Sequence, residues 1–325
     1  MKKLGFGLMR LPQKDGQIDI EETKQMVDMF LEAGFTYFDT AWAYPGSEDA
    51  IQTGAGYFDY YLLHNLGEGR TKYFNDFDMW EWIQEKKREG LVKNAGFSFH
   101  STPEELEELL TAHPEMDFVQ LQINYADWEN PAVQSRRCYE IARKYEKPII
   151  VMEPVKGGML ATPPQSVVNI LKEAEPGSSA ASWGIRFAAD KEGVITVLSG
   201  MSSIAQMRDN LSYMTDFTGL KEEQRRVIKN AQEELAKIPL IPCTTCNYCA
   251  KVCPMDIGIS GSFTAMNYLT LYGDKDAALG QENWLVGKHG RKRADQCIKC
   301  GKCEEACPQH IKIRENLEEV KRVLL

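Results

Sequence analysis

Two cysteine motifs with the same spacing stand near the end of the chain. The pattern C-x-x-C-x-x-C-x-x-x-C-P occurs twice, with Cys243, Cys246, Cys249 and Cys253 in the first run and Cys297, Cys300, Cys303 and Cys307 in the second. Three thiolates of such a run bind one four-iron cluster, and the fourth binds the other cluster where two runs occur together. We therefore expect two 4Fe-4S clusters held within one folded unit.

Zinc and disulfides are the alternatives for these cysteines. Structural zinc also uses C-x-x-C pairs, but it takes four ligands in two pairs and not four cysteines in one run with a trailing proline. The chain starts MKKLGFGLM, which is no signal peptide, and it has no apolar run long enough to span a bilayer. Such a chain is expected to be cytoplasmic, where thiols stay reduced. The ninth cysteine, Cys138, lies in a helical pattern and is predicted to be a core residue.

Length and charge limit the remaining choices. A chain of 325 residues with 43% hydrophobic and 26% charged residues is typical of a globular protein of about two domains. The net charge of -9 argues against a nucleic-acid surface, which needs a positive footprint, and no membrane segment is expected. One short basic cluster is interpreted as a solvated loop or as a docking patch for an acidic, soluble electron carrier: Lys288, Arg291, Lys292 and Arg293.

Before the cysteines, apolar strand patterns alternate with helical patterns. Strands are predicted at residues 4–9, 36–40, 57–64, 92–98, 118–123, 148–153 and 194–200. Helices are predicted between them, at residues 20–33, 79–88, 103–111, 133–144 and 180–189. Buried strands separated by helices are typical of a parallel sheet, and this many units favour a barrel over an open sheet. No G-x-G-x-x-G follows the first strand, which weakens a Rossmann interpretation.

Five segments of this region together resemble the aldo/keto reductase family. They are FDTAWAY at residues 38–44, LLH at 62–64, GFS at 96–98, QLQIN at 120–124 and EPVKGG at 153–158. The resemblance covers roughly residues 1–214 and implies a TIM-type (β/α)8 barrel. The full chain is similar to the bacterial branch of this family that carries a C-terminal 4Fe-4S ferredoxin-like domain.

The resemblance implies three catalytic residues, Asp39, Tyr44 and His64. In this family a tyrosine is the general acid toward a carbonyl oxygen, a histidine orients the carbonyl, and an aspartate with a lysine tunes the tyrosine. Asp39 and His64 end predicted strands and Tyr44 lies in the loop after the first of them, so all three are expected at the C-terminal mouth, where barrel enzymes work. Taken singly, each also has a structural interpretation, as a helix cap, a surface aromatic and a partner for a backbone group.

One part of the family pattern is missing. The family's lysine lies on a strand expected between Ile51 and Tyr57, but the chain there reads only Gln52-Thr53-Gly54-Ala55-Gly56. Seven strands within roughly 214 residues also fall short of a complete barrel, which typically takes about 250. Either one βα unit is truly deleted or the sequence lacks a segment of the native protein. The second is favoured, because seven strands would leave two unpaired edges in a barrel.

The resemblance also implies a nicotinamide cofactor, NAD or NADP. The positions that match cofactor contacts of the family are Ser98, Gln122, Gly200, Asp209 and Asn210. The loop after the last strand leads into a helix, and barrels commonly bind phosphate at such a place. Each of these residues also fits a scaffold role. The family's basic contacts to a 2′-phosphate are not matched, so the two cofactors are not distinguished.

Two functions stay open. The prolines at positions 239 and 242 end a charged helix, which predicts a barrel domain of residues 1–238 and a mainly helical ferredoxin-like domain of residues 239–325. A nicotinamide gives up two electrons at once, whereas each cluster takes one. The first function is reduction of a small-molecule carbonyl, or oxidation of an alcohol, with the clusters for electron transfer. The second is an electron-transfer protein in which a degenerate barrel is a docking scaffold.

Overall fold

The chain divides into two compact units. The computed structural model describes residues 2–41, 44–50, 56–67, 70–131, 133–243, 245, 247–307 and 309–325. One unit is formed by Met1–Ala161 with Ile170–Lys229, and the other by Thr162–Asn169 with Asn230–Leu325. The domain boundary after Ile238 stays a prediction. Within the described part of the chain, no helix has the length and apolar character needed to cross a membrane; the cytoplasmic location also stays a prediction.

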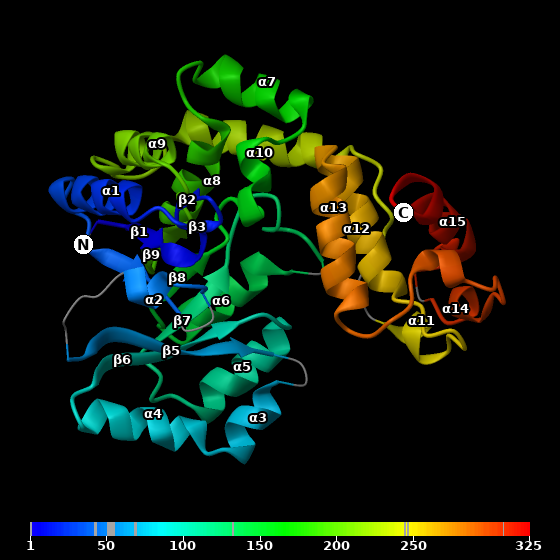
Figure 1. Ribbon diagram of the computed structural model, residues 1–325, viewed down its shortest axis with the longest axis horizontal. Helices are drawn as coiled ribbons and strands as arrows, with labels where there is room; N and C mark the ends of the chain where they lie inside the picture. Colours follow the sequence, from blue (N-terminus) through cyan, green and yellow to red (C-terminus); the bar gives the residue numbers. More distant parts are fainter. Residues whose placement is uncertain are drawn as a thin grey trace. The chain divides into compact units, whose positions relative to one another are not determined.

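The first unit is built on a parallel sheet of seven strands (Figure 1), in the spatial order β4-β1-β9-β8-β7-β6-β5. The strands are β1 (Leu4–Gly7), β4 (Tyr37–Asp39), β5 (Phe58–Leu66), β6 (Val92–Phe99), β7 (Phe118–Gln122), β8 (Ile149–Met152) and β9 (Val194–Ser199). Every strand predicted from the sequence is present. Most predicted ends lie within one residue of the observed ones. Two ends differ by two residues, because Leu8–Arg10 form a 3-10 helix after β1 and β5 continues two residues beyond His64.

This strand order is that of a barrel with one unit left out. Each strand pairs with the neighbour that a barrel would give it, except that β4 and β5 are not paired and form the two edges of the sheet. The absent unit therefore belongs between β4 and β5, where the sequence lacks the lysine-bearing strand. The prediction of a TIM-type barrel with one βα unit missing is confirmed. Part of the joining segment, residues 51–55, lies outside the described residues.

Helices cover the sheet and begin where the sequence offers hydrogen-bonding caps. The caps Asp19, Thr102, Ser179 and Ser203 each accept a hydrogen bond from a backbone amide in the first turn. The helices of this unit are α1 (Ile20–Glu32), α2 (Ser47–Ala50), α3 (Thr71–Asp76), α4 (Met79–Arg88), α5 (Pro103–Ala112), α6 (Ser135–Lys144), α8 (Ala180–Ala189) and α9 (Ile204–Met214). Two further helices, α7 (Gln165–Ala174) and α10 (Glu222–Ala236), include residues of both units.

An aromatic and aliphatic layer fills the inside of the sheet below its C-terminal end. Phe118, Ile150 and Leu198 are buried there, and Tyr37 and Tyr60 pack against them. The rings of Tyr37 and Tyr60 lie 5.5 Å apart between their centroids, so the sheet curls until the inner faces of β4 and β5 touch. Because side chains alternate along a strand, the residues two positions further along each strand also face inward, in the next layer toward the C-terminal mouth.

The second unit uses one local structure twice, with equivalent residues 54 positions apart, as Cys243 and Cys297 are. The short helices α11 (Tyr248–Lys251) and α14 (Lys302–Glu305) occupy equivalent positions, and α12 (Ile259–Tyr272) and α15 (Ile313–Val323) begin at equivalent residues. Left-handed backbone conformations recur at matching places, at Thr245, Asn247 and Asp256 and at Lys299, Gly301 and His310. Helix α13 (Lys275–Glu282) and a π-helical turn, Asn283–Gly287, stand between the repeats. The predicted mainly helical character is confirmed.

Candidate active site and cluster site

The predicted barrel residues share one layer at the mouth. Alternation from Tyr37 and Tyr60 places Asp39 and His64 on the inner face of β4 and β5. All described pairings within the seven-stranded sheet are parallel, so these C-terminal ends meet at the same edge. The inward positions of this layer are Asp39 on β4, His64 on β5, Ser98 on β6, Gln122 on β7, Met152 on β8 and Gly200 directly after β9.

Asp39 and Tyr44 form a hydrogen-bonded pair. The Tyr44 hydroxyl donates to Asp39 Oδ2 over 3.4 Å. Burial raises the pKa of Asp39 to about 6, even though the bond from Tyr44 lowers it. Burial, followed by the charge of Asp39, raises the pKa of Tyr44 above its ordinary value. A general acid benefits from the opposite shift, and no cation contacts Asp39 among the described residues to provide it.

His64 lies in a different set of contacts. Its pKa is lowered by partial burial and by the positive charge of Arg70. His100, which directly follows β6, interacts electrostatically with both of them. In the described part of the chain, no hydrogen bond joins His64 to Asp39 or Tyr44. Arg70 and His100 were not predicted from the sequence, because their placement depends on how β5 and β6 end.

A buried ion pair lies at the end of β7. Lys156 Nζ donates to Asp127 Oδ1 over 2.5 Å, and Asp127 is only 1% exposed. The side-chain amides of Gln122 and Asn124 both donate to the other carboxylate oxygen, over 3.1 and 2.8 Å. Gln122 was expected to contact a cofactor, whereas the ion pair of Asp127 with Lys156 was not predicted from the sequence. Ser98 has a different partner, since its hydroxyl accepts from the Asn65 amide over 2.7 Å.

The segment after β9 carries the remaining predicted cofactor residues. A Cβ atom on Gly200 would meet nothing within 4 Å, so open space lies above this residue. The amides of Ser202 and Ile204 already donate to Gln206 Oε1 and Glu22 Oε1, over 2.7 and 3.0 Å.

Two of these residues lie on α9. Asp209 accepts a hydrogen bond from the Ser179 hydroxyl over 2.7 Å. Asn210 is 4% exposed, and its Oδ1 has no hydrogen-bond partner in the described structure. A buried acceptor without a donor fits a residue that awaits a ligand group.

The second unit brings cysteines of both runs to one cavity. Cys297, Cys300 and Cys303 line it together with Cys253, the fourth cysteine of the first run. Met255, Ile257, Ile259 and Leu317 supply apolar walls. The amides of Ile257 and Lys299 donate to the sulfurs of Cys253 and Cys297, each over 3.4 Å. Three thiolates of one run with the fourth of the other, with amide bonds to sulfur, fit a 4Fe-4S cluster.

The other cysteines follow the repeat as far as the structure describes them. Cys249 and Cys307 are buried, and Cys243 packs partly buried against the same core. Cys246 lies outside the described residues. Cys138 is buried in the first unit, where burial raises the pKa of its thiol to about 12, as expected for a core residue.

A curled parallel sheet with polar residues at its C-terminal mouth, followed by a repeated cysteine module, defines an oxidoreductase of the barrel class with an iron-sulfur domain. The family model described as the aldo/keto reductase family matches residues 3–55 and 52–233, two segments that meet where the βα unit is absent. The chain belongs to the aldo/keto reductase family. A model described as a 4Fe-4S dicluster domain matches residues 242–311.

Solved structures agree on the fold. The aldo-keto reductase AKR11C1 from Bacillus halodurans, in its holo form, is 20% identical, with a TM-score of 0.57 over 70% of this chain and 91% of that chain. An aldo/keto reductase from Klebsiella pneumoniae in complex with NADP and acetate is 15% identical, with a TM-score of 0.56 over the same shares. No curated protein sequence matches the chain.

Proposed function

We propose that the barrel mouth reduces the carbonyl group of a small molecule, or oxidises the corresponding alcohol. The observation that carries this proposal is the hydrogen-bonded pair of Asp39 and Tyr44, on the inner layer that also holds His64. Tyr44 holds the proton for the carbonyl oxygen, and Asp39 accepts from its hydroxyl and orients it. The lowered pKa of His64 keeps its ring neutral near pH 7, so it can donate a hydrogen bond to the same oxygen. A bound nicotinamide supplies the hydride.

The cofactor would be held by Ser98, Gln122, Gly200, Asp209 and Asn210. Open space at Gly200 lets a ligand approach the backbone, and the unpaired Oδ1 of Asn210 can accept from an amino group. A phosphate would replace Glu22 and Gln206 as the acceptor of the amides before α9. The K. pneumoniae structure contains NADP; here the choice between NAD and NADP stays open.

We also propose two 4Fe-4S clusters. The first would be bound by Cys297, Cys300, Cys303 and Cys253, which share one cavity. The repeat of the backbone supports a second cluster on the other four cysteines of the two runs, Cys243, Cys246, Cys249 and Cys307. Clusters of this kind exchange single electrons.

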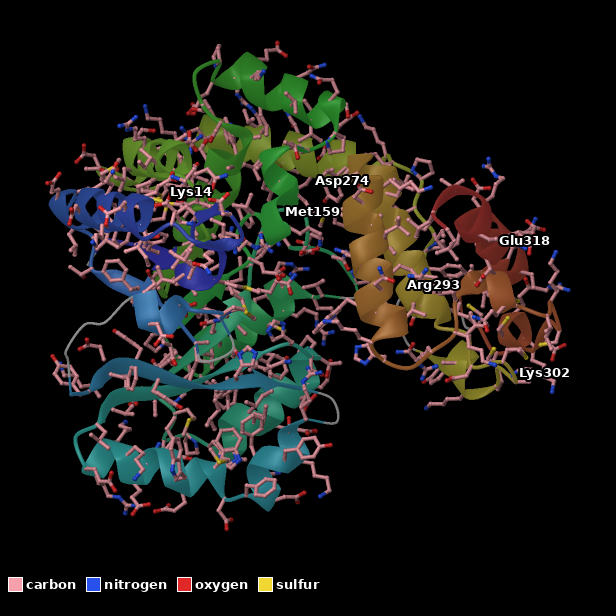
Figure 2. All side chains as sticks on the ribbon, viewed as in Figure 1. Lys14, Met159, Asp274, Arg293, Lys302 and Glu318 are labelled. Carbon is pink, nitrogen blue, oxygen red and sulfur yellow. The ribbon has the colours of Figure 1, made fainter. Side chains whose placement is uncertain are left out.

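A basic surface beside the first cluster site supports an acidic, soluble electron carrier as partner. Lys292 pairs through its backbone with Asp256 and Gly258, on either side of Ile257, which lines the cluster cavity. Lys288 lies over the ring of Trp284, which is 57% exposed. Arg293, labelled in Figure 2, is held by the buried Glu282. An exposed aromatic ring beside Lys288, in a segment that also carries Lys292 and Arg293, suits a negatively charged protein.

One observation favours the second function, an electron-transfer protein with a barrel scaffold. Tyr44 has a raised pKa, and Asp39 has no cationic neighbour within the described residues. The raised pKa of Tyr44 and the lack of a cation near Asp39 both make proton donation by Tyr44 harder than in a site that has a lysine. We rank this function second, because the inward layer at the mouth keeps its polar residues.

The substitution Tyr44→Phe tests the proposed function. We expect the turnover number for aldehyde reduction by the full chain to fall about 10²- to 10⁴-fold, because the phenol proton is needed as charge develops on the oxygen. Nucleotide affinity, measured by fluorescence titration, should change little. Tyr73→Phe, which changes an exposed tyrosine on α3, is the matched control. Unchanged turnover in Tyr44→Phe would remove the catalytic role and favour the scaffold function.

A further inference from the structure

Three basic side chains gather at the mouth between β5 and α3. His64 lies on β5, His100 directly follows β6, and Arg70 caps the start of α3. The His100 amide donates to the Leu66 carbonyl over 3.0 Å, which holds the ends of the two strands together. A bulge after Leu63, with Asn65 at a φ of 63°, sets the direction of the chain here.

Arg70 is anchored toward His100. Its Nε donates to the Asn65 carbonyl over 2.7 Å. A Cβ atom on Gly67 would lie 3.0 Å from Arg70 Nη2 and 3.1 Å from the His100 carbonyl oxygen, so both groups converge on this glycine. Partial burial, then His64 and Arg70, lower the pKa of His100 to about 4. The two rings are therefore neutral near pH 7, and Arg70 carries the charge.

No carboxylate neutralises this charge among the described residues. None of the three side chains forms an ion pair there, and Glu105 accepts instead from the hydroxyl of Thr71, over 2.8 Å. A guanidinium without an acid, held by a backbone carbonyl and flanked by imidazoles that can donate hydrogen bonds, is suited to a planar anion.

We propose that Arg70 and His100 bind a carboxylate of the substrate, so that the mouth selects carbonyl compounds that carry a carboxylate group. This inference rests on the proposed function. Most of the proposed nucleotide contacts lie on β7, α9 and the segment after β9, whereas Arg70 lies at the start of α3 and His100 directly after β6. We therefore assign the guanidinium to the substrate and not to a phosphate of the cofactor.

The experiment compares 4-carboxybenzaldehyde with 4-methylbenzaldehyde, which share shape but not charge. The wild-type chain should give the higher kcat/KM with the carboxylated aldehyde. Arg70→Gln should lower the ratio of the two kcat/KM values about 10- to 100-fold, the worth of a hydrogen bond to a charged group. Arg70→Lys should restore part of the ratio. Arg88→Gln, which removes an exposed arginine paired with Glu81 on α4, should leave the ratio as in the wild type.

Calorimetric titration with benzoate and benzamide needs no turnover and separates the two proposals. If neither aldehyde is reduced but benzoate binds, and Arg70→Gln weakens it about 10-fold or more, the carboxylate site stands and the carbonyl reductase function fails. Equal affinity of the wild type for benzoate and benzamide would overturn the carboxylate site. The carboxylate site would also be overturned if Arg70→Gln left the ratio of the two kcat/KM values unchanged, or if it weakened NADP binding and not benzoate binding.

Discussion

Asp39 is a partly buried carboxyl group held by a single described hydrogen bond, from Tyr44. Its position at the end of a strand was predictable, because strand ends follow from the apolar pattern. Its hydrogen-bond partner was also predictable, because a tyrosine lies in the loop five residues after Asp39. The neighbouring residues Arg70 and His100, and the ion pair of Asp127 with Lys156, were not predictable from the sequence. Each pair joins two segments that are distant in the sequence and are brought together by the fold.

The raised pKa of Asp39 predicts a pH-dependent stability. The folded state holds this proton more tightly than the unfolded state, whose pKa is about 4, so folding loses stability as pH rises from about 4 through 6. Asp39→Asn removes this titration. The unfolding free energy of the variant relative to the wild type should therefore rise by about 2 kcal/mol between pH 4 and pH 8, in urea unfolding.

Asp190→Asn is the control, because its effect on stability should depend on pH with the opposite sign. Although burial alone would raise it, the pKa of Asp190 is lowered by hydrogen bonds, first among them that from Arg225. Its substitution should therefore cost stability above pH 4, and this cost should shrink as pH falls below about 4 through the lowered pKa. If the difference in unfolding free energy between Asp39→Asn and the wild type does not change with pH, the raised pKa of Asp39 is contradicted.

The elements with strong apolar periodicity were predicted well, whereas one short hairpin and one helix of ordinary length were missed. The seven strands and the main helices follow from alternating patterns and caps. The hairpin of β2 (Gln13–Lys14) and β3 (Gln17–Ile18) was missed because each strand has two residues, although Asp15-Gly16, both at positive φ, is a turn signal. Helix α7 was missed although two prolines precede it, which is a start signal.

The repeated cysteine elements predict which ligands share a cluster. Anaerobically purified protein should hold about eight irons and eight sulfides per chain. Cys253→Ser and Cys300→Ser should alter the same reduced-cluster signal in electron paramagnetic resonance, because both line one cavity. Cys307→Ser should alter the other signal, and Cys138→Ser neither. Zinc in place of iron would contradict the clusters, and different signals for Cys253→Ser and Cys300→Ser would contradict the exchange of ligands between the runs.

At the scale of the whole molecule, two kinds of electron transfer stand in one chain. In the proposed function a carbonyl takes a hydride at the barrel, whereas a 4Fe-4S cluster takes one electron at a time. The structure defines each unit by itself. The acidic external carrier that we propose would bind at the basic segment that includes Trp284 and Lys288.

That surface predicts salt-sensitive electron exchange. Lys288→Glu with Lys292→Glu should slow reduction of the clusters by an acidic ferredoxin about 10-fold at low ionic strength, in stopped-flow experiments, and the difference should shrink as salt is added. Lys275→Glu with Lys221→Glu, at two exposed lysines outside this surface, changes the net charge by the same amount and should have a smaller effect. If the control variant slows cluster reduction as much, the effect comes from the net charge alone, and binding at this surface is contradicted.

The fate of the hydride tests the central claim, that this mouth carries out nicotinamide-dependent carbonyl chemistry. The full chain would be incubated with an aldehyde and with nicotinamide cofactor carrying deuterium at the transferable position, and the alcohol analysed by mass spectrometry. We expect one deuterium on the former carbonyl carbon, and about 10²- to 10⁴-fold slower formation of the labelled alcohol in Tyr44→Phe. Alcohol without deuterium, or no alcohol from any aldehyde while the clusters still exchange electrons, would contradict it.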